Sequence, residues 1–340
     1  MSGFFSRILL VFGGIVFLAS CSDRKSQESV AGARPKKIVF KAASVLPAEH
    51  PSSKALVFMK TRMEELTGGA MEIQLFLNSQ LGNETESIQN CQNGNIQMVF
   101  ASVAPLSQFV PQLNALAMPF LFRDKAHEFA VVDGEIGKKM ATRLEAIGLH
   151  TLCYFDAGSR NIMTKKGPVA KPEELKGMKI RVMPSQLMVD TINALGATAI
   201  SMNQGEVYSA LQTGVLDGWE NNPPTTVSFK MYETGCVYFA WTRHLAVPDL
   251  LLVNYKFYQG LSGDQRRIVD QIARETVLKQ RELWRENEQK AVEELKAKGI
   301  HFNTLDVSLF SSRVGKVYQE AYKKYGKEFE DLCLSIKDWK

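Results

Sequence analysis

The sequence predicts an α/β protein built from two lobes. Its 340 residues exceed the usual size of one domain, and 45% of them are apolar, enough to bury two cores. Short alternating apolar stretches, each followed by a capped helical stretch, occur in the first part of the chain and again in the middle. Two sets of strand and helix units joined by crossovers favour two lobes with a cleft between them.

The amino-terminal segment is predicted to be a targeting signal. Arg7 precedes an apolar run at residues 8–18, which at about 11 residues is too short for a membrane span. The run ends in Leu18-Ala19-Ser20-Cys21, which resembles a lipoprotein signal peptidase site. We therefore expect removal of residues 1–20, a lipid on Cys21 and a flexible tether over residues 21–37; an uncleaved anchor is the alternative.

The first lobe begins with repeated strand and helix units. Strands are predicted at residues 38–44, 71–77 and 96–101, with helices at 51–66 and 84–92. The loops at the carboxyl ends of these strands carry His50, Glu84 and Ser102. Because ligands of open α/β sheets bind at that edge, we expect these three residues to face one cleft.

Two chain crossovers and one long helix are predicted to join the lobes. The apolar strand at 149–155 gives way to a different composition at 156–160, and a second return falls at 246–248. A capping box at residues 262–265 begins a helix whose next strong stop is Gly299. About 37 residues of helix would span about 55 Å, longer than one lobe. We assign residues 38–157 and 248–285 to lobe 1, and residues 158–247 and 286–340 to lobe 2.

A short strand in the second lobe ends close to an arginine. In residues 179–183, Ile180 and Val182 share one face, which leaves Arg181 on the other face near the carboxyl end. The planar guanidinium fork of arginine suits a carboxylate, to which it donates two parallel hydrogen bonds. A solvated strand-end arginine is the alternative reading of this position alone.

The following residues predict two helices and a further strand. Ser185 is expected to cap a helix that stops at Gly196, and Asn203 with Glu206 resembles a capping box for a helix that stops at Gly214. The next strand ends in the acid and amide pair Glu220 and Asn221. The order strand, helix, strand, helix, strand is typical of an α/β lobe.

Several motifs in this region occur together in one order. The runs LKGMKIRV, NALGA and GEVYSALQTGVLDGWENNPP are similar to the signature of the DctP family, the substrate-binding proteins of tripartite ATP-independent periplasmic (TRAP) transporters. The likeness extends from about residue 38 to about residue 300, and includes NSQLGNETES upstream. It implies a two-lobed, periplasmic-binding-protein-like fold and capture of a small organic acid without a cofactor. It also implies delivery to a small and a large membrane subunit.

The resemblance assigns carboxylate recognition to the second lobe. Arg181 stands where the family holds its carboxylate-gripping arginine, and Arg160 matches the second cleft arginine. Asn221 would donate to the same carboxylate or to an adjacent oxygen. Glu220 would either join the site or brace the hinge or an arginine.

The first-lobe assignments concern the other end of the ligand. Glu84 and Ser102 align with positions that face ligand hydroxyls in the family, and His50 lies on the loop after the first strand. Gln204 stands where relatives present an aromatic wall, so its amide would make the cleft more polar. Both features favour a hydroxylated ligand.

The ligand class also follows from resemblance. The ENNPP run and the segment at residues 181–197 look most like the branch of the family that binds hexuronates and related sugar acids. A C4-dicarboxylate or 2-oxo acid remains an alternative, as does a ligand sensor that feeds a signalling receptor. The expected location is the periplasm or cell envelope, with a lipid anchor in a membrane.

Other classes of function find no support in the sequence. The five histidines show no H-E-x-x-H spacing, and neither a G-x-S-x-G nor a phosphate-binding glycine loop occurs, so we expect no enzyme. Much of the formal charge of +5 belongs to the leader and the tether, so the net charge of the remaining residues does not indicate a nucleic-acid-binding surface. A cation held by Glu220 and Asp249 is a minor alternative, and we assign no metal. The four cysteines after Cys21 are widely scattered and do not define a disulfide pattern.

Overall fold

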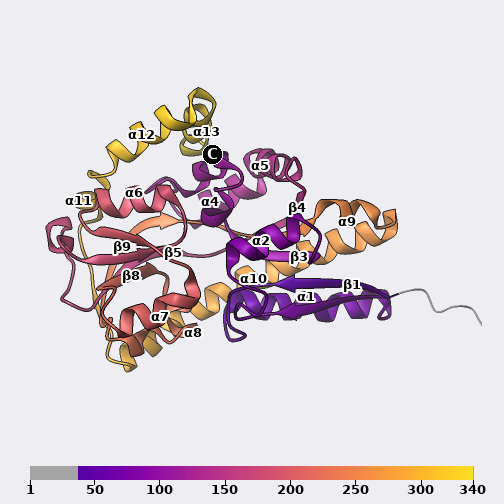
Figure 1. The fold of residues 1–340 in the computed structure, drawn as a ribbon, viewed down its shortest axis with the longest axis horizontal. Coiled ribbons are helices and arrows are strands. Elements are labelled where there is room, and N and C mark those ends of the chain that lie inside the picture. The colour runs from indigo at the N-terminus through magenta and orange to yellow at the C-terminus, as the bar shows by residue number, and fades with distance from the viewer. Residues whose placement is uncertain (1–36, 340) are drawn as a thin grey trace, which may run out of the picture. The chain divides into compact units, whose positions relative to one another are not determined.

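The computed structural model describes residues 37–339, which form one compact unit containing two β-sheets flanked by helices (Figure 1). The predictions for the signal segment, Cys21 and nearly all of the tether lie outside the described residues. None of the described helices combines the length and the apolar character that a membrane crossing needs.

The first sheet has five strands in the order β2-β1-β3-β10-β4. β1 pairs in parallel with β2 and β3, whereas β10 runs antiparallel to both β3 and β4. The chain therefore leaves this sheet after β4 and re-enters it through β10. The strands are β1 (Ile38–Ala43), β2 (Met71–Phe76), β3 (Met98–Ser102), β4 (Leu149–Phe155) and β10 (Asp249–Asn254).

The second sheet has six strands in the order β11-β9-β5-β8-β6-β7. Its β6, β7 and β8 are mutually parallel, and β5 is antiparallel to its neighbours β8 and β9. The carboxyl ends of β6 and β8 consequently lie at one edge of the sheet. The strands are β5 (Ser159–Thr164), β6 (Lys179–Val182), β7 (Thr198–Ser201), β8 (Gly218–Asn221), β9 (Tyr238–Ala246) and β11 (His301–Asn303).

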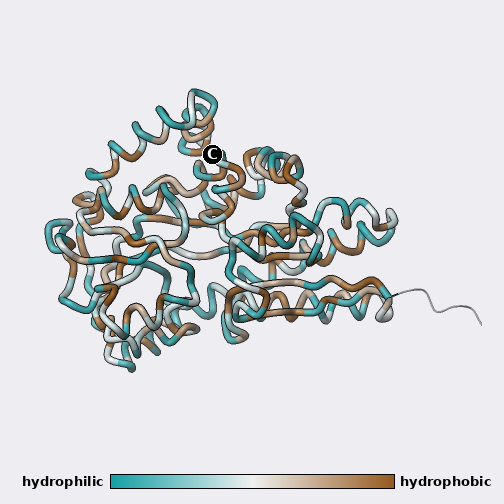
Figure 2. Tube along the Cα trace, viewed as in Figure 1, coloured by the Kyte–Doolittle hydropathy of each residue, from teal (hydrophilic) through white to brown (hydrophobic). Residues whose placement is uncertain are grey.

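Helices cover both sheets, and apolar and hydrophilic segments alternate along them as expected for helices with one buried face (Figure 2). The α-helices are α1 (Pro51–Thr67), α2 (Glu84–Gln92), α3 (Val103–Leu106), α4 (Lys125–Asp133), α5 (Glu135–Glu145), α6 (Gln186–Ala194), α7 (Gln204–Gln212), α8 (Pro223–Ser228), α9 (Tyr255–Gly260), α10 (Gly263–Ala297), α11 (Val307–Ser311), α12 (Gly315–Tyr325) and α13 (Lys327–Lys337). Three 3₁₀ segments complete the set: η1 (Pro111–Ala117), η2 (Pro172–Leu175) and η3 (Met231–Thr234).

The crossovers fall where the sequence predicts them, and the fold class is confirmed. Three residues separate β4 from β5, and two separate β9 from β10. α10 is a single 35-residue helix that packs against α1 of the first lobe and α8 of the second (Figure 1). The lobe boundaries stay a prediction, and the carboxyl-terminal helices contact parts of both assigned ranges: α12 packs on α6, and α13 packs on η1.

Of three side-chain helix caps predicted from the sequence, one is present in the structure and two are not. Ser262 forms the predicted capping box with Gln265 at the start of α10. The box predicted at Asn203 is wrong, because its side chain donates to the Glu206 carboxylate instead of accepting from the backbone. Ser185 occupies the N-cap position of α6 without a side-chain hydrogen bond. A capping box that was not predicted joins Asn83 and Glu86 at the start of α2.

Candidate functional site

A cavity between the two lobes brings together all seven residues predicted to bind a ligand. The second lobe contributes Arg160, Arg181, Gln204 and Asn221, and the first lobe contributes His50, Glu84 and Ser102. Asp249, Asn222, Thr225 and Trp284 also line this cavity, together with Val45, Leu46, Phe100, Ala157, Met183 and Phe229. The cavity is therefore polar where the strand ends meet and apolar elsewhere.

Arg181 is a buried cation with unused hydrogen-bonding capacity. It lies on β6, an inner strand of the second sheet between β7 and β8, and is 1% exposed. Its Nε donates to the Met202 carbonyl at 2.9 Å. Burial lowers the pKa of Arg181 to about 10, which still leaves the guanidinium charged at neutral pH. Its Nη1 has no hydrogen-bond partner among residues 37–339.

Two further donors on the cavity wall share this property. Within the described part of the chain, the Gln204 amide nitrogen and the Trp284 indole nitrogen are buried and have no partner. Buried donors in folded proteins are nearly always paired, with protein, water or ligand. Arg181, Gln204 and Trp284 together define a cavity suited to a molecule rich in acceptor oxygens.

Arg160 differs from Arg181 because a protein carboxylate already holds it. Its Nε and Nη2 donate to the two carboxylate oxygens of Glu220 at 2.5 and 2.7 Å, and Nη2 also contacts the Glu220 carbonyl at 2.9 Å. Burial opposes ionisation of Glu220, but the charge of Arg160 and contact with His244 lower its pKa overall. Of the two roles that the sequence leaves open for Glu220, the geometry matches the brace for an arginine.

Asn221 and Asn222 organise the end of β8. The Asn221 side-chain oxygen accepts from the Asn222 backbone N–H at 2.9 Å and lies 3.4 Å from Arg160 Nη1. Asn222 caps α8 by accepting from the Thr225 N–H, and its amide donates to the Ala157 carbonyl in the first crossover. The strand end is thus tied both to the following helix and to the hinge.

His50 bridges the two lobes across the cavity. Its Nδ1 accepts from the Ser52 backbone N–H at 3.2 Å, which caps α1. That bond leaves the proton on Nε2, which donates to the Thr225 hydroxyl at 3.1 Å. Burial, and then the charge of Lys54, lowers the pKa of His50 to about 3, so the ring is neutral.

Glu84 and Ser102 stand together on the first-lobe wall. The Ser102 backbone N–H donates to Glu84 Oε1 at 2.5 Å. Asp249, the first residue of β10, pairs directly with Ser102, the last residue of β3. The sequence suggested Asp249 only as a cation ligand, because the alignment of β10 with β3 joins residues far apart in the chain.

Trp284 was not predicted at the site, although it lines the cavity and lies against Gly158 of the first crossover. It is fully buried on α10, and its ring lies 5.7 Å from the His50 ring between centroids. A Cβ on Gly158 would lie 3.0 Å from Trp284, and Gly158 has a φ of 61°, so the close approach requires glycine. The sequence predicted the helix that carries Trp284 but gave no signal that this side chain reaches the cavity.

The residues predicted as a minor cation site do not converge on one. No group of three or more metal-binding side chains occurs within residues 37–339. Glu220 is engaged by Arg160 and lies 3.5 Å from His244, while Asp249 belongs to the first-lobe wall. The four cysteines in the described range are all free thiols.

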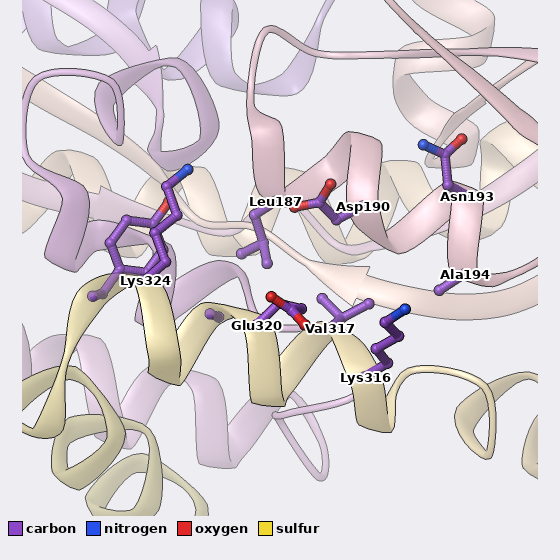
Figure 3. Close-up of a pocket in the computed structure, with 10 residues that line it drawn as sticks. Leu187, Asp190, Asn193, Ala194, Lys316, Val317, Glu320 and Lys324 are labelled. Carbon is purple, nitrogen blue, oxygen red and sulfur yellow. The ribbon is translucent and has the colours of Figure 1, made fainter.

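A second depression lies between α6 and α12 (Figure 3). Leu187 and Val317 form its base, and the charged side chains of Asp190, Lys316, Glu320 and Lys324 surround it (Figure 3). Those four residues are exposed, and none of the buried unpartnered polar atoms of the described chain lies among its lining residues. The polar cavity between the lobes is therefore the better candidate for ligand recognition.

Two α/β lobes, with a polar cavity at their junction that holds a buried arginine, have the architecture of a solute-binding protein. The chain belongs to the DctP family of bacterial extracellular solute-binding proteins, family 7, whose model matches residues 42–325. The family consists of periplasmic solute-binding proteins that serve transport, rather than enzymes. The predicted membership and class of function are confirmed.

Three relatives illustrate the match. A TRAP periplasmic solute-binding protein of Bradyrhizobium, solved with α/β-D-galacturonate, is 35% identical, with a TM-score of 0.84 over 88% of this chain and 99% of that one. One from Pseudomonas putida F1, solved with D-glucuronate, is 35% identical, with a TM-score of 0.82 over 87% and 96%. The C4-dicarboxylate-binding periplasmic protein DctP of Rhodobacter capsulatus is 31% identical over 85% of each chain.

Proposed function

We propose that this protein captures a hexuronate or a related sugar acid between its lobes and delivers it to the small and large subunits of a TRAP transporter. The observation that carries this proposal is the buried, unpartnered guanidinium nitrogen of Arg181 in a cavity that also contains the unpartnered amide of Gln204. A carboxylate supplies the charge and the acceptor oxygens that these donors need.

The opposite wall supports a hydroxylated ligand. Glu84, Ser102 and Asp249 offer carboxyl and hydroxyl groups, which exchange hydrogen bonds with sugar hydroxyls. Two relatives were solved with galacturonate and with glucuronate. Each of these sugars has a carboxylate at one end and hydroxyls around the rest of the ring, which matches the arginine on one wall of the cavity and the acidic and hydroxyl groups on the other. This agreement favours a hexuronate over other organic acids.

The remaining predicted residues act around that core. Asn221 would donate its amide to the ligand carboxylate beside Arg181, since its oxygen is already engaged by Asn222. Arg160, neutralised by Glu220, would direct an outer N–H to the ligand and hold Asn221 in place. Both ring nitrogens of His50 already have protein partners, so we assign His50 to the wall and to the bridge that joins the lobes on closure.

A C4-dicarboxylate binder is the alternative function. Two carboxylates would require a second available cation opposite Arg181. Arg160 is the nearest choice, but Glu220 already neutralises its charge through two hydrogen bonds. A ligand sensor would have the same cavity and a different partner protein. Genes for two membrane subunits next to the gene for this protein would favour transport over sensing.

A thermal-shift screen of uronates, aldonates and C4-dicarboxylates tests the proposed ligand class. We expect D-galacturonate or D-glucuronate to raise the melting temperature by several degrees, because a ligand that binds only the folded state stabilises it by about 2.7 kcal/mol at 100 times its Kd. The stabilising acid should be recovered unchanged after prolonged incubation. Stabilisation by dicarboxylates alone would contradict the proposal, and consumption of the acid would indicate an enzyme.

We also propose that Cys21 carries a lipid that anchors the protein to a membrane of the cell envelope. The support is the Leu18-Ala19-Ser20-Cys21 sequence at the end of a short apolar run. Cys21→Ser should abolish incorporation of labelled fatty acid into the protein and block normal processing. Lipidation would be contradicted if the Cys21→Ser variant were still cleaved at the same bond and the wild-type chain took up no labelled fatty acid. That result would not bear on the proposal for solute binding.

A further inference from the structure

The cavity between the lobes is electrostatically asymmetric. Its second-lobe wall carries the buried guanidinium of Arg181 and the neutralised pair of Arg160 with Glu220. Its first-lobe wall carries two carboxyl groups, Glu84 and Asp249, for which no lysine or arginine partner within 4.0 Å exists in the described chain. The two ends of a bound ligand would therefore meet opposite chemistry.

Both acidic residues lie next to Ser102. Glu84 begins α2 directly after the capping residue Asn83, and its Oε1 accepts the Ser102 N–H at 2.5 Å. Asp249 begins β10 and is the antiparallel partner of Ser102. Both acidic side chains retain some exposed surface, and this surface lines the cavity.

The surroundings of these two acids favour their neutral forms. Burial raises the pKa of Glu84 to about 7, against the lowering effects of the Ser102 N–H, Arg181 and Arg160. Burial, and then the charge of Glu84, raises the pKa of Asp249 to about 8; Asp156 acts in the same direction, and Arg160 and the Ser102 hydroxyl oppose it. Two nearby carboxylates ionise together only at a large electrostatic cost, so the pair holds at least one proton near neutral pH.

We propose that the Glu84, Ser102 and Asp249 cluster selects acids with a single carboxylate, by binding a hydroxylated end and rejecting a second carboxylate. This inference rests on the proposed function and adds a role for Asp249. A hydroxyl both donates and accepts, so it satisfies a carboxylate and a carboxylic acid at once. A second ligand carboxylate would instead meet the negative charge that the partly ionised pair still carries near pH 7.5, with no cation available to compensate its desolvation.

The test compares D-galacturonate with galactarate, in which the end opposite the first carboxylate is oxidised to a second one. Titration calorimetry at pH 7.5 should show that the wild type binds galacturonate at least 100-fold more tightly than galactarate, and this ratio of affinities is the quantity compared below. The isosteric double variant Glu84→Gln with Asp249→Asn should narrow that ratio at least tenfold, mainly through tighter galactarate binding. Any effect of ring form is common to both proteins, so the change in ratio isolates the acid pair.

Exposed Glu49 provides the matched control, because it is a solvated acid on the loop before α1. Glu49→Gln should leave the ratio unchanged. If the double variant fails to fold, the wild type alone gives the answer through its pH dependence. Both sugar acids stay ionised above about pH 5, whereas the acid pair becomes neutral below about pH 6, so the ratio should be smaller at pH 5.5 than at pH 8.5.

Each outcome decides between the two proposals. Galacturonate binding with an equal affinity for galactarate, or a ratio that neither the double variant nor pH changes, overturns the selection by Glu84 and Asp249 and leaves the proposed function intact. Galactarate binding without galacturonate binding, or binding of neither acid by the wild type, refutes the hexuronate function and this inference with it.

Discussion

At the scale of single residues, the two arginines of the cavity differ in their hydrogen-bond partners. Both lie on second-lobe strands, and both are almost fully buried. Neither the residue type nor the degree of burial shows which of them is free to bind a ligand carboxylate. The difference lies in Glu220, which approaches Arg160 with two short hydrogen bonds and leaves Arg181 as the unneutralised cation. Side-chain pairing between β5 and β8 decides this, and the sequence carries no local signal for it.

Gly158 shows how one residue at the hinge shapes the cavity. Gly158→Ala would force a Cβ against Trp284 at 3.0 Å in a left-handed backbone conformation, which costs about 1–2 kcal/mol in strain alone. We expect a lower unfolding free energy together with weaker uronate binding, because Trp284 lines the cavity. Chemical denaturation and calorimetry measure the two effects.

Gly260→Ala is the control for this substitution, since a Cβ on Gly260 would meet no heavy atom within 4 Å and the residue lies at the end of α9, outside the cavity lining. Its stability and affinity should stay close to wild type. A Gly158→Ala protein with unchanged stability and unchanged affinity would show that the contact with Trp284 is unimportant.

At the scale of elements, α10 is joined to the first crossover and to α1 through polar contacts as well as apolar ones. Gln280 is fully buried, accepts from the Asp156 N–H at 3.0 Å and donates to the Asp156 carbonyl at 2.7 Å. The same amide lies 3.3 Å from the Ser52 hydroxyl at the start of α1. One side chain thus holds the first crossover and the first helix against the middle of α10.

Gln280→Leu should destabilise the protein markedly. The substitution leaves the buried Asp156 N–H and carbonyl without partners, at a cost of about 1–3 kcal/mol for each group. We expect the free energy of unfolding to fall by about 3 kcal/mol in denaturant titration. Gln271→Leu, on an exposed position of the same helix, should change it little; equal effects of the two substitutions would argue against a clamp at the crossover.

The sequence predicted α10 better than it predicted the helix's buried face. Its capping box at Ser262 and its stop at Gly299 were explicit, and the crossing of both lobes followed from its length. Gln280 and Trp284, which are fully buried in the middle of the helix, do not follow from its length or its end signals. Polar residues enter a core only when tertiary partners satisfy them, and those partners are invisible in local periodicity.

At the scale of the whole molecule, the fold brings strand ends from two sheets to one cavity. The rule that ligands bind at the carboxyl ends of parallel strands placed His50, Glu84, Ser102 and Arg181 correctly on its walls. The rule fails for Asp249, which begins an antiparallel strand, and for Trp284, which lies on a helix. Both enter the cavity through long-range packing that follows from the crossovers.

Binding and closure are coupled through residues of both lobes. His50 of the first lobe reaches Thr225 of the second, and Arg181 faces the Glu84 wall across the cavity. A ligand that contacts both walls favours the closed arrangement by its greater affinity for that form. We therefore expect capture of an acid to depend on the guanidinium of Arg181 on one wall, and selectivity among acids to depend on the acid pair on the other.

Calorimetric titration of D-galacturonate into the wild type and the Arg181→Lys variant tests the central claim most directly. Lysine keeps the charge but loses the planar fork, so we predict at least tenfold weaker binding, with Arg181→Ala weaker still and the exposed Arg267→Lys control unchanged. An Arg181→Lys protein that binds galacturonate with wild-type affinity would contradict recognition of the ligand carboxylate by Arg181.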